Sequence, residues 1–116
     1  MEKFLLLLRE DYKVRENMTP EESNKSVQTM IEWIESLAQS GNYVGSEPLN
    51  NAGRYVSKDY VLSDGPFIEA KEAISGYMMI TAENLEQATS ITQACPLVLN
   101  DGMIIEVRPV GHKSCR

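Results

Sequence analysis

The residues best suited to chemistry lie in one short stretch, which combines a turn with four charged side chains. It leads into a predicted strand near Gly76 and reads Asp64-Gly65-Pro66-Phe67-Ile68-Glu69-Ala70-Lys71-Glu72. Pro66 has no N–H, so the carboxylate of Asp64 cannot make the usual turn bond to the backbone two residues on. Asp64 can therefore accept a hydrogen bond from another part of the fold or from a ligand.

Two interpretations of this stretch stay open. If the chain is extended after Pro66, Glu69 and Lys71 project to the same side and can pair. In one interpretation they edge a pocket, where Asp64 or Glu69 is an acid, a base or a ligand anchor and Tyr77 adds a phenolic hydroxyl. In the other, Asp64 caps its own turn and the charges form a solvated rim, because exposed ion pairs are common and weak.

Two arginines, Arg54 and Arg108, are further candidates for ligand binding. The guanidinium group of a strand arginine that faces away from the core can clamp a carboxylate. The alternative is a structural ion pair, in which Arg108 binds Asp64, Glu69 or a carboxylate across a dimer.

The other reactive side chains offer little chemistry. Cys95 lies on the apolar stripe of a predicted helix, and no positive neighbour in the sequence activates it, which favours a small core residue over a nucleophile. His112 is the only histidine, and it has no carboxylate or second ligand nearby in the sequence. Because no glycine-rich phosphate loop or ligand cluster is present either, we predict neither a metal nor a cofactor.

Length and composition predict one globular domain. The chain has 116 residues, 42% of them hydrophobic, and a net charge of −6. We assign residues 1–110 to the domain and 111–116 to a polar tail. No basic run is present, so we expect neither nucleic acid nor an anionic membrane as a partner. The apolar run Phe4–Leu8 is too short to span a bilayer, so we expect a cytoplasmic protein.

Alternation and helical spacing define the elements that would position these residues. Strands are predicted at 3–9, 76–81 and 103–108, the first two with apolar side chains on both faces. Shorter strands are expected at 43–47 and in a hairpin, 54–57 with 60–63, while residues 10–17 read as a loop. A helix begins at Pro20 behind a Thr19 cap and ends at Ser40-Gly41. Its predicted core stripe comprises Val27, Met30, Ile31, Ile34, Leu37 and Ala38, with Trp33 at the edge of the core.

A second helix is expected from an Asn84 cap until Pro96 breaks it. The resulting order matches an α+β, ferredoxin-like (split βαβ) protomer. Two helices cover only one face of such a sheet, and the other face keeps too much apolar surface for a soluble monomer. We therefore predict a homodimer in which two sheets pack face to face into a dimeric α/β barrel, with a cavity between sheet and helices or near the dimer seam.

Several motifs resemble those of the DGPF-type branch of the YCII-related proteins. They are Asp64-Gly65-Pro66-Phe67, Glu69-Ala70-Lys71-Glu72, Gly76-Tyr77, Cys95-Pro96 and Ile105-Glu106-Val107-Arg108-Pro109-Val110. The resemblance implies a dimeric α+β barrel and no known reaction. A better-studied branch has a suspected His/Asp pair, but here the first helix contains no His, and Cys95 stands before Pro96. Related domains occur attached to RNA-polymerase sigma factors, which suggests a link to such a partner by resemblance alone.

Two functions follow from these observations. The favoured one is a homodimeric module that binds a small molecule or regulates a partner, with Asp64, Glu69, Lys71, Tyr77 and Arg108 as the candidate ligand-binding residues. The alternative is a cofactor-independent enzyme that acts on a small organic substrate, with Asp64 and Glu69 as acid or base.

Overall fold

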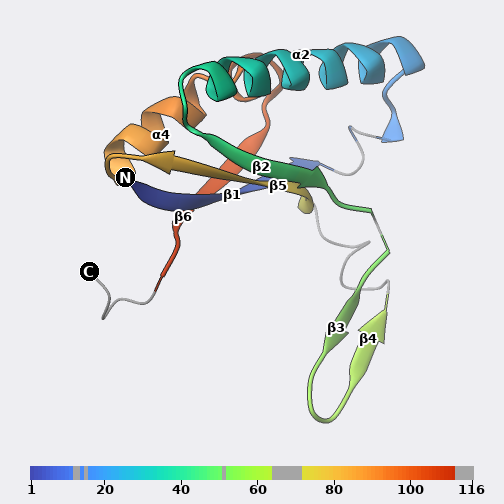
Figure 1. Cartoon of the computed structure of the whole chain (residues 1–116). Coiled ribbons are helices and arrows are strands. Elements are labelled where there is room, and N and C mark those ends of the chain that lie inside the picture. Colours follow the sequence, from blue (N-terminus) through green and yellow to red (C-terminus); the bar gives the residue numbers. More distant parts are fainter. Residues whose placement is uncertain (12–13, 15, 51, 64–71, 112–116) are drawn as a thin grey trace.

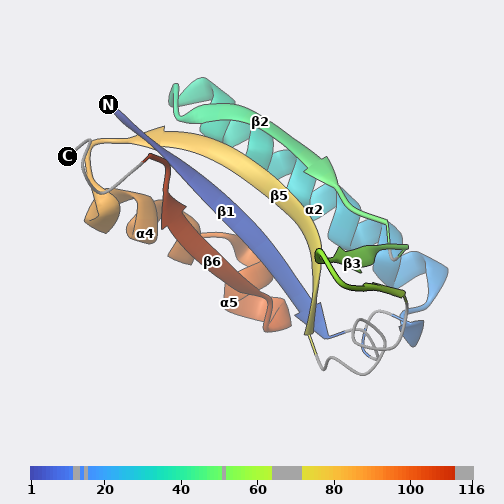
Figure 2. The same cartoon turned by 90° about the horizontal axis from the view of Figure 1, so that it is seen from below.

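A computed structural model describes residues 1–11, 14, 16–50, 52–63 and 72–111 of the chain. Within these residues the fold is a four-stranded antiparallel sheet with the order β2-β5-β1-β6, and three helices cover one of its faces (Figures 1 and 2). The elements are β1 Glu2–Asp11, α2 Pro20–Gln39, β2 Tyr43–Pro48, β3 Arg54–Val56, β4 Val61–Ser63, β5 Glu72–Ala82, α4 Leu85–Gln93, α5 Pro96–Asp101 and β6 Ile104–Pro109. This order is compatible with the ferredoxin-like arrangement that the sequence predicts.

The central strand β1 confirms the prediction of two apolar faces. Phe4 and Leu6 are buried on the side of the helices, whereas Leu5 and Leu7 are half-buried on the opposite side. The pairing of β1 with β5 shifts after Leu8, which lies opposite Gly76, while the next residue lies opposite Ile74. An irregularity of this kind bends the strand and re-aims the side chains around it.

The face of the sheet without helices is called the open face below. Its side chains form rows across the strands, because paired residues project to the same side. One row runs Glu47, Tyr77, Leu7, Glu106 from β2 to β6, and the next runs Gly45, Met79, Leu5, Arg108. The apolar members therefore lie on the two central strands and the charged members on the edge strands.

Helix α2 begins as predicted. The hydroxyl of Thr19 accepts a hydrogen bond from the Glu22 N–H at 3.1 Å, and the Glu22 carboxylate accepts one from the Thr19 N–H at 3.0 Å. This reciprocal pair is a capping box, with Pro20 at the first helical position. The helix ends at Ser40, and Gly41 follows with a φ of 82°, a conformation that favours glycine.

The predicted core stripe of α2 is partly wrong. Trp33, expected only at the core edge, is buried with Leu37, whereas Ala38 is exposed. Val27 and Ile31 are 56% and 42% exposed, although they lie on the side of the helix that faces the sheet. The first half of α2 thus stands over a cavity, and only its second half packs tightly.

Two other expectations are corrected. Pro96 does not simply end the second helix: α4 stops at Gln93, and Pro96 is the first residue of a third helix, α5. Proline suits that position because the first turn of a helix needs no N–H from it. In the stretch expected to be a loop, Val14 and Glu16 are helical.

The hydrophobic core lies between the helices and the sheet. Its buried members are Phe4, Leu6, Leu8, Trp33, Leu37, Met78, Ile80, Ala82, Ala88, Cys95, Leu97 and Met103. The principal extents of the chain are 43 × 39 × 18 Å. The radius of gyration of 15.6 Å exceeds the roughly 13.4 Å expected of a compact chain of this length.

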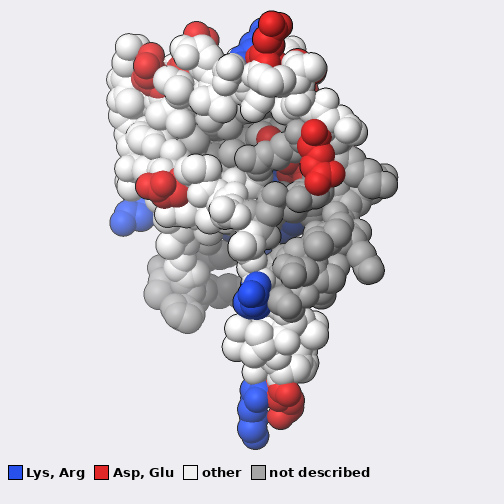
Figure 3. Space-filling model, turned by 90° about the vertical axis from the view of Figure 1, so that its right-hand side faces the viewer, with Lys and Arg blue, Asp and Glu red and all other residues white. Residues whose placement is uncertain are grey.

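Strands β3 and β4 form a separate two-stranded sheet, in agreement with the predicted hairpin. The Ser57 N–H donates to the Tyr60 carbonyl at 2.9 Å and closes the turn, which contains Lys58 and Asp59. The hairpin projects from the body on the side of the open face, away from α2 (Figure 1). In Figure 3 it is the narrow projection at the bottom, with charges of both signs at its tip.

Candidate functional site

A cavity of about 310 Å³ lies between the first half of α2 and the strands β2 and β5. Its walls are mainly aliphatic and thioether side chains, with four serines and two glutamates among them. The apolar lining comprises Leu8, Met18, Val27, Met30, Ile31, Ile34, Pro48, Met78, Leu97 and Met103, and the polar lining comprises Glu10, Ser23, Ser26, Ser46, Glu47 and Ser75.

A second cavity of about 290 Å³ adjoins the first, since both are lined by Glu10, Met18, Ser26, Leu97 and Met103. It extends toward the end of β1 and the end of α5. There its lining is more polar and includes Arg9, Asp11 and Asp101. The combined space therefore has an apolar inner part and a charged outer part.

Local features of the sequence keep the inner cavity open. Gly76 lines it, and a Cβ at that position would lie 3.1 Å from the Glu47 carbonyl oxygen, which is closer than side chains normally approach. Ser75, next to the shifted register, donates its hydroxyl to the Leu8 carbonyl at 3.4 Å. Ser46 shares a 2.6 Å hydrogen bond with the Tyr43 hydroxyl. Small side chains thus occupy the floor where larger ones would fill the space.

The electrostatics of the inner cavity favour some ligands over others. Among the described residues that line it, the acidic ones are Glu10 and Glu47, and none is Lys, Arg or His. The pairing of Glu47 with Tyr77 places the Glu47 side chain on the open face, so Glu10 is the carboxylate on the cavity side. A carboxylate or phosphate placed there would be repelled by Glu10 and would lose its hydration without a cation among these lining residues. An uncharged or cationic molecule meets no such cost.

The predicted site residues divide into three groups. Asp64, Glu69 and Lys71 lie outside the described residues. Tyr77 is among the lining residues of the inner cavity, although the alternation along β5 places its side chain on the open face. The third group is Arg108, which takes part in a cluster on the open face.

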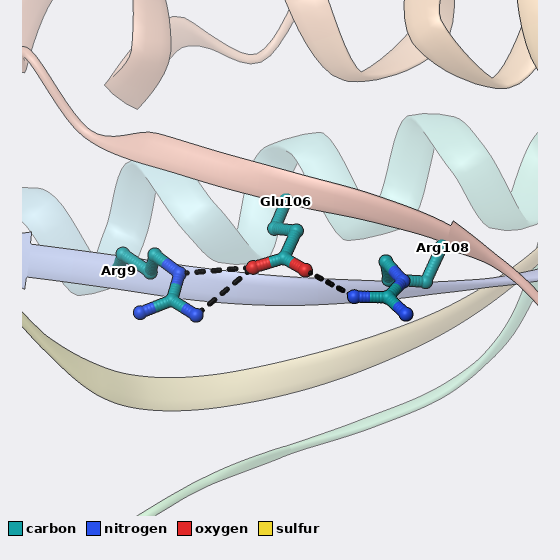
Figure 4. Close-up of polar contacts among 3 residues, drawn as sticks. All are labelled: Arg9, Glu106 and Arg108. Atoms are coloured by element: carbon teal, nitrogen blue, oxygen red, sulfur yellow. Dashed lines mark hydrogen bonds and ion pairs between the residues drawn. The ribbon is translucent and has the colours of Figure 1, made fainter.

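Arg108 binds Glu106 and does not line the inner cavity. Its Nη1 lies 2.8 Å from Glu106 Oε2, while Arg9 Nη2 and Nε lie 2.9 and 3.2 Å from Glu106 Oε1 (Figure 4). Hydrogen bonds from Arg108 and then from Arg9 lower the pKa of the Glu106 carboxyl. Sequence alternation places Glu106 and Arg108 on one face, but the contribution of Arg9 depends on the register between β1 and β6.

The arginine of the hairpin has a local partner. Arg54 donates from Nη1 to the carbonyl oxygen of Gly53 at 2.8 Å. It lies on β3, outside the lining of both cavities beneath α2.

The match to a known family agrees with this architecture. The family model of the YCII-related domain matches residues 3–111, from the start of β1 to just past β6. The chain belongs to the YCII-related domain family. No curated protein matches the chain.

Cys95 has the surroundings of a core residue in this YCII-related domain. Its side chain is fully buried, and burial raises the pKa of the thiol. A raised pKa removes the thiolate that a nucleophile needs. His112 lies outside the described residues.

The described part of the domain shows no group of side chains able to hold a metal ion. The same part contains no helix that is long and apolar enough to cross a membrane.

Proposed function

We propose that this YCII-related domain binds a small, largely apolar molecule that is uncharged or cationic, and that it does so as a homodimer. The observation that carries the proposal is the cavity beneath α2. Its volume of about 310 Å³ is in the range of small-molecule sites, and apolar walls with a few polar groups are typical of such sites.

The lining defines the chemistry of the ligand. Met18, Met30 and Met78 present flexible thioethers, which adapt to irregular apolar shapes. The hydroxyls of Ser23 and Ser26 lie on the helix side, where they can bond a hydroxyl or amine of the ligand. The ligand we propose therefore has a hydrocarbon or aromatic body and a small polar head.

A binding role is favoured over catalysis because the catalytic pair suspected in a better-studied branch of the family has no counterpart. Helix α2 contains no histidine, and Cys95, which stands before Pro96, is buried in the core. We further propose, from the Asp64-Gly65-Pro66-Phe67 motif, that the domain belongs to the DGPF-type branch.

The exposed surface supports a homodimer. The chain exposes 8288 Å², whereas a compact monomer of 13.0 kDa exposes roughly 6,300 Å². The excess of roughly 1,900 Å² exceeds the approximately 800 Å² that each partner contributes to a standard interface. A second sheet seated on the open face would cover part of this exposed surface.

The pattern of the open face also suits a second copy. Leu5, Leu7 and Met79 form an apolar centre on β1 and β5, as in the core of an interface with a polar rim. One edge carries Glu47 on β2, and the other carries the Arg9–Glu106–Arg108 cluster, which has one positive charge in excess. In a dimer with two-fold symmetry, the negative edge of each copy can therefore lie against the positive edge of the other. The dimer we propose is a face-to-face α/β barrel.

A ligand screen and a mass measurement test the proposal. Thermal shift with matched neutral, cationic and anionic aromatic compounds should raise the Tm with neutral or cationic members only. Ser26→Phe, which fills the cavity, should abolish the shift, whereas Gln28→Phe on the exposed side of α2 should keep it. Light scattering should give the mass of two chains. An absence of any shift, or an unchanged shift in Ser26→Phe, would contradict ligand binding at this site.

A further inference from the structure

We propose that the β3–β4 hairpin is an arm that clasps a second copy of this chain. The inference rests on the homodimer proposed above and goes beyond it, because it assigns a contact to an element outside the main sheet. The proposed occupant of the arm's apolar surface is the flank of the partner's body.

The hairpin is apolar on both of its faces. Paired residues share a face, so Tyr55 and Leu62 lie on one side, and Val56 and Val61 lie on the other with Arg54. Val56 is 75% exposed and Val61 is 61% exposed. Two adjacent, β-branched side chains on one face thus remain in water in the single chain.

A hairpin of this length needs packing from elsewhere. An isolated two-stranded sheet is at best marginally stable in water, and it gains independent stability when one face is covered. In the described residues, β3 and β4 pair with each other and with no strand of the main sheet. The exposed valine face therefore identifies where the missing cover would lie.

The position of the hairpin indicates what covers it. The hairpin leaves the body on the side of the open face, whereas the helices lie on the other side (Figures 1 and 2). A body seated on the open face would lie beside the arm and could cover Val56 and Val61. With two-fold symmetry both arms are covered at once, because each contact occurs twice.

Charge favours a copy of this chain as the occupant. Residues 54–62 contain Arg54, Lys58 and Asp59, a net charge of +1, so the rest of the chain carries −6 − (+1) = −7. A positive arm is attracted to an acidic body. In a dimer with two-fold symmetry, the arm of each copy meets the acidic body of the other, so both contacts are attractive.

The test compares dimer dissociation constants by sedimentation. The double variant Val56→Thr/Val61→Thr keeps β-branched shape but adds hydroxyls, and we expect it to weaken the dimer at least tenfold. Leu99→Gln is the matched control: Leu99 is 65% exposed on α5, on the side of the helices, and its replacement should leave the constant unchanged. Lys58→Glu, at the turn, should weaken the dimer several-fold at low salt and less at high salt.

The outcomes separate the two proposals. A wild-type mass of one chain at micromolar concentration would overturn the homodimer and the arm together. A wild-type dimer whose dissociation constant is unchanged both in Val56→Thr/Val61→Thr and in Lys58→Glu would overturn the arm alone. Because β3 and β4 lie outside the hydrophobic core, circular dichroism of each variant should show the wild-type fold.

Discussion

Arg9 on β1 and Glu106 on β6 are joined by two hydrogen bonds, of 2.9 and 3.2 Å, although they are 97 positions apart in the chain. The bonds run across the open face, next to the apolar centre formed by Leu5 and Leu7. Arg108 binds the second oxygen of the same carboxylate at 2.8 Å. The cluster therefore ties the edge strand to the centre of the sheet and leaves one positive charge on that edge.

The lowered pKa of Glu106 predicts a pH-dependent stability. A carboxyl whose pKa is lower in the folded state stabilises the fold above its unfolded pKa of about 4.3, and the contribution disappears as the pH falls through the folded pKa. Glu106→Gln should therefore lower the Tm at pH 7, and the difference from wild type should shrink below about pH 4.3. Thermal melts from pH 7 to pH 3 measure this difference.

Glu35→Gln is the control for this experiment, since Glu35 is exposed on α2, away from the open face. Its Tm should follow that of the wild type throughout. A Tm difference for Glu106→Gln that stays constant down to pH 3 would show that the carboxylate charge is not the source of the stabilisation.

The capping box predicts the cost of removing a hydroxyl. Thr19→Ala deletes the acceptor of the Glu22 N–H and should lower the free energy of unfolding by about 1 kcal/mol. Thr19→Ser keeps the acceptor and should retain most of the stability. Urea denaturation measures both. Equal losses in the two variants would mean that the hydroxyl bond is not what stabilises this end of α2.

Two glycines in neighbouring strands should respond differently to the same change. Gly76→Ala places a Cβ 3.1 Å from the Glu47 carbonyl oxygen, so we expect a loss of about 1 kcal/mol or more. At Gly45 no atom lies within 4 Å of the added Cβ, and Ala there should be neutral or slightly stabilising. Chemical denaturation of the two variants gives the comparison, and a stable Gly76→Ala would show that β2 moves aside at no cost.

The burial of Cys95 predicts low reactivity of its thiol. In a Cys115→Ser background, Cys95 is the only cysteine. Because the side chain is fully buried and burial raises its pKa, a maleimide should label it at least 100-fold more slowly in the folded protein than in urea. Rapid labelling of the folded protein at pH 7 would reveal an accessible thiolate and reopen a nucleophilic role.

The parts of the fold that depend on local pattern could be predicted from the sequence. Thr19, Pro20 and Glu22 define the start of α2, and the leucine run of β1 defines a central strand. The prediction that Pro96 only ends a helix was wrong, because proline both stops one helix and suits the first turn of another. The Arg9–Glu106 contact could not be predicted, because it depends on the register of two strands from opposite ends of the chain.

The adjacent residues Leu6 and Leu7 allow the two faces of the sheet to be tested separately. Leu6 is fully buried beneath the helices, so Leu6→Ala should cost about 2–5 kcal/mol of folding free energy. Leu7 lies on the open face between Tyr77 and Glu106, where it is half-buried in the single chain. Leu7→Lys should leave each chain folded but place two unpaired charges in the proposed dimer seam, so light scattering should report the mass of one chain. A Leu7→Lys variant that remains dimeric would show that the second copy packs elsewhere.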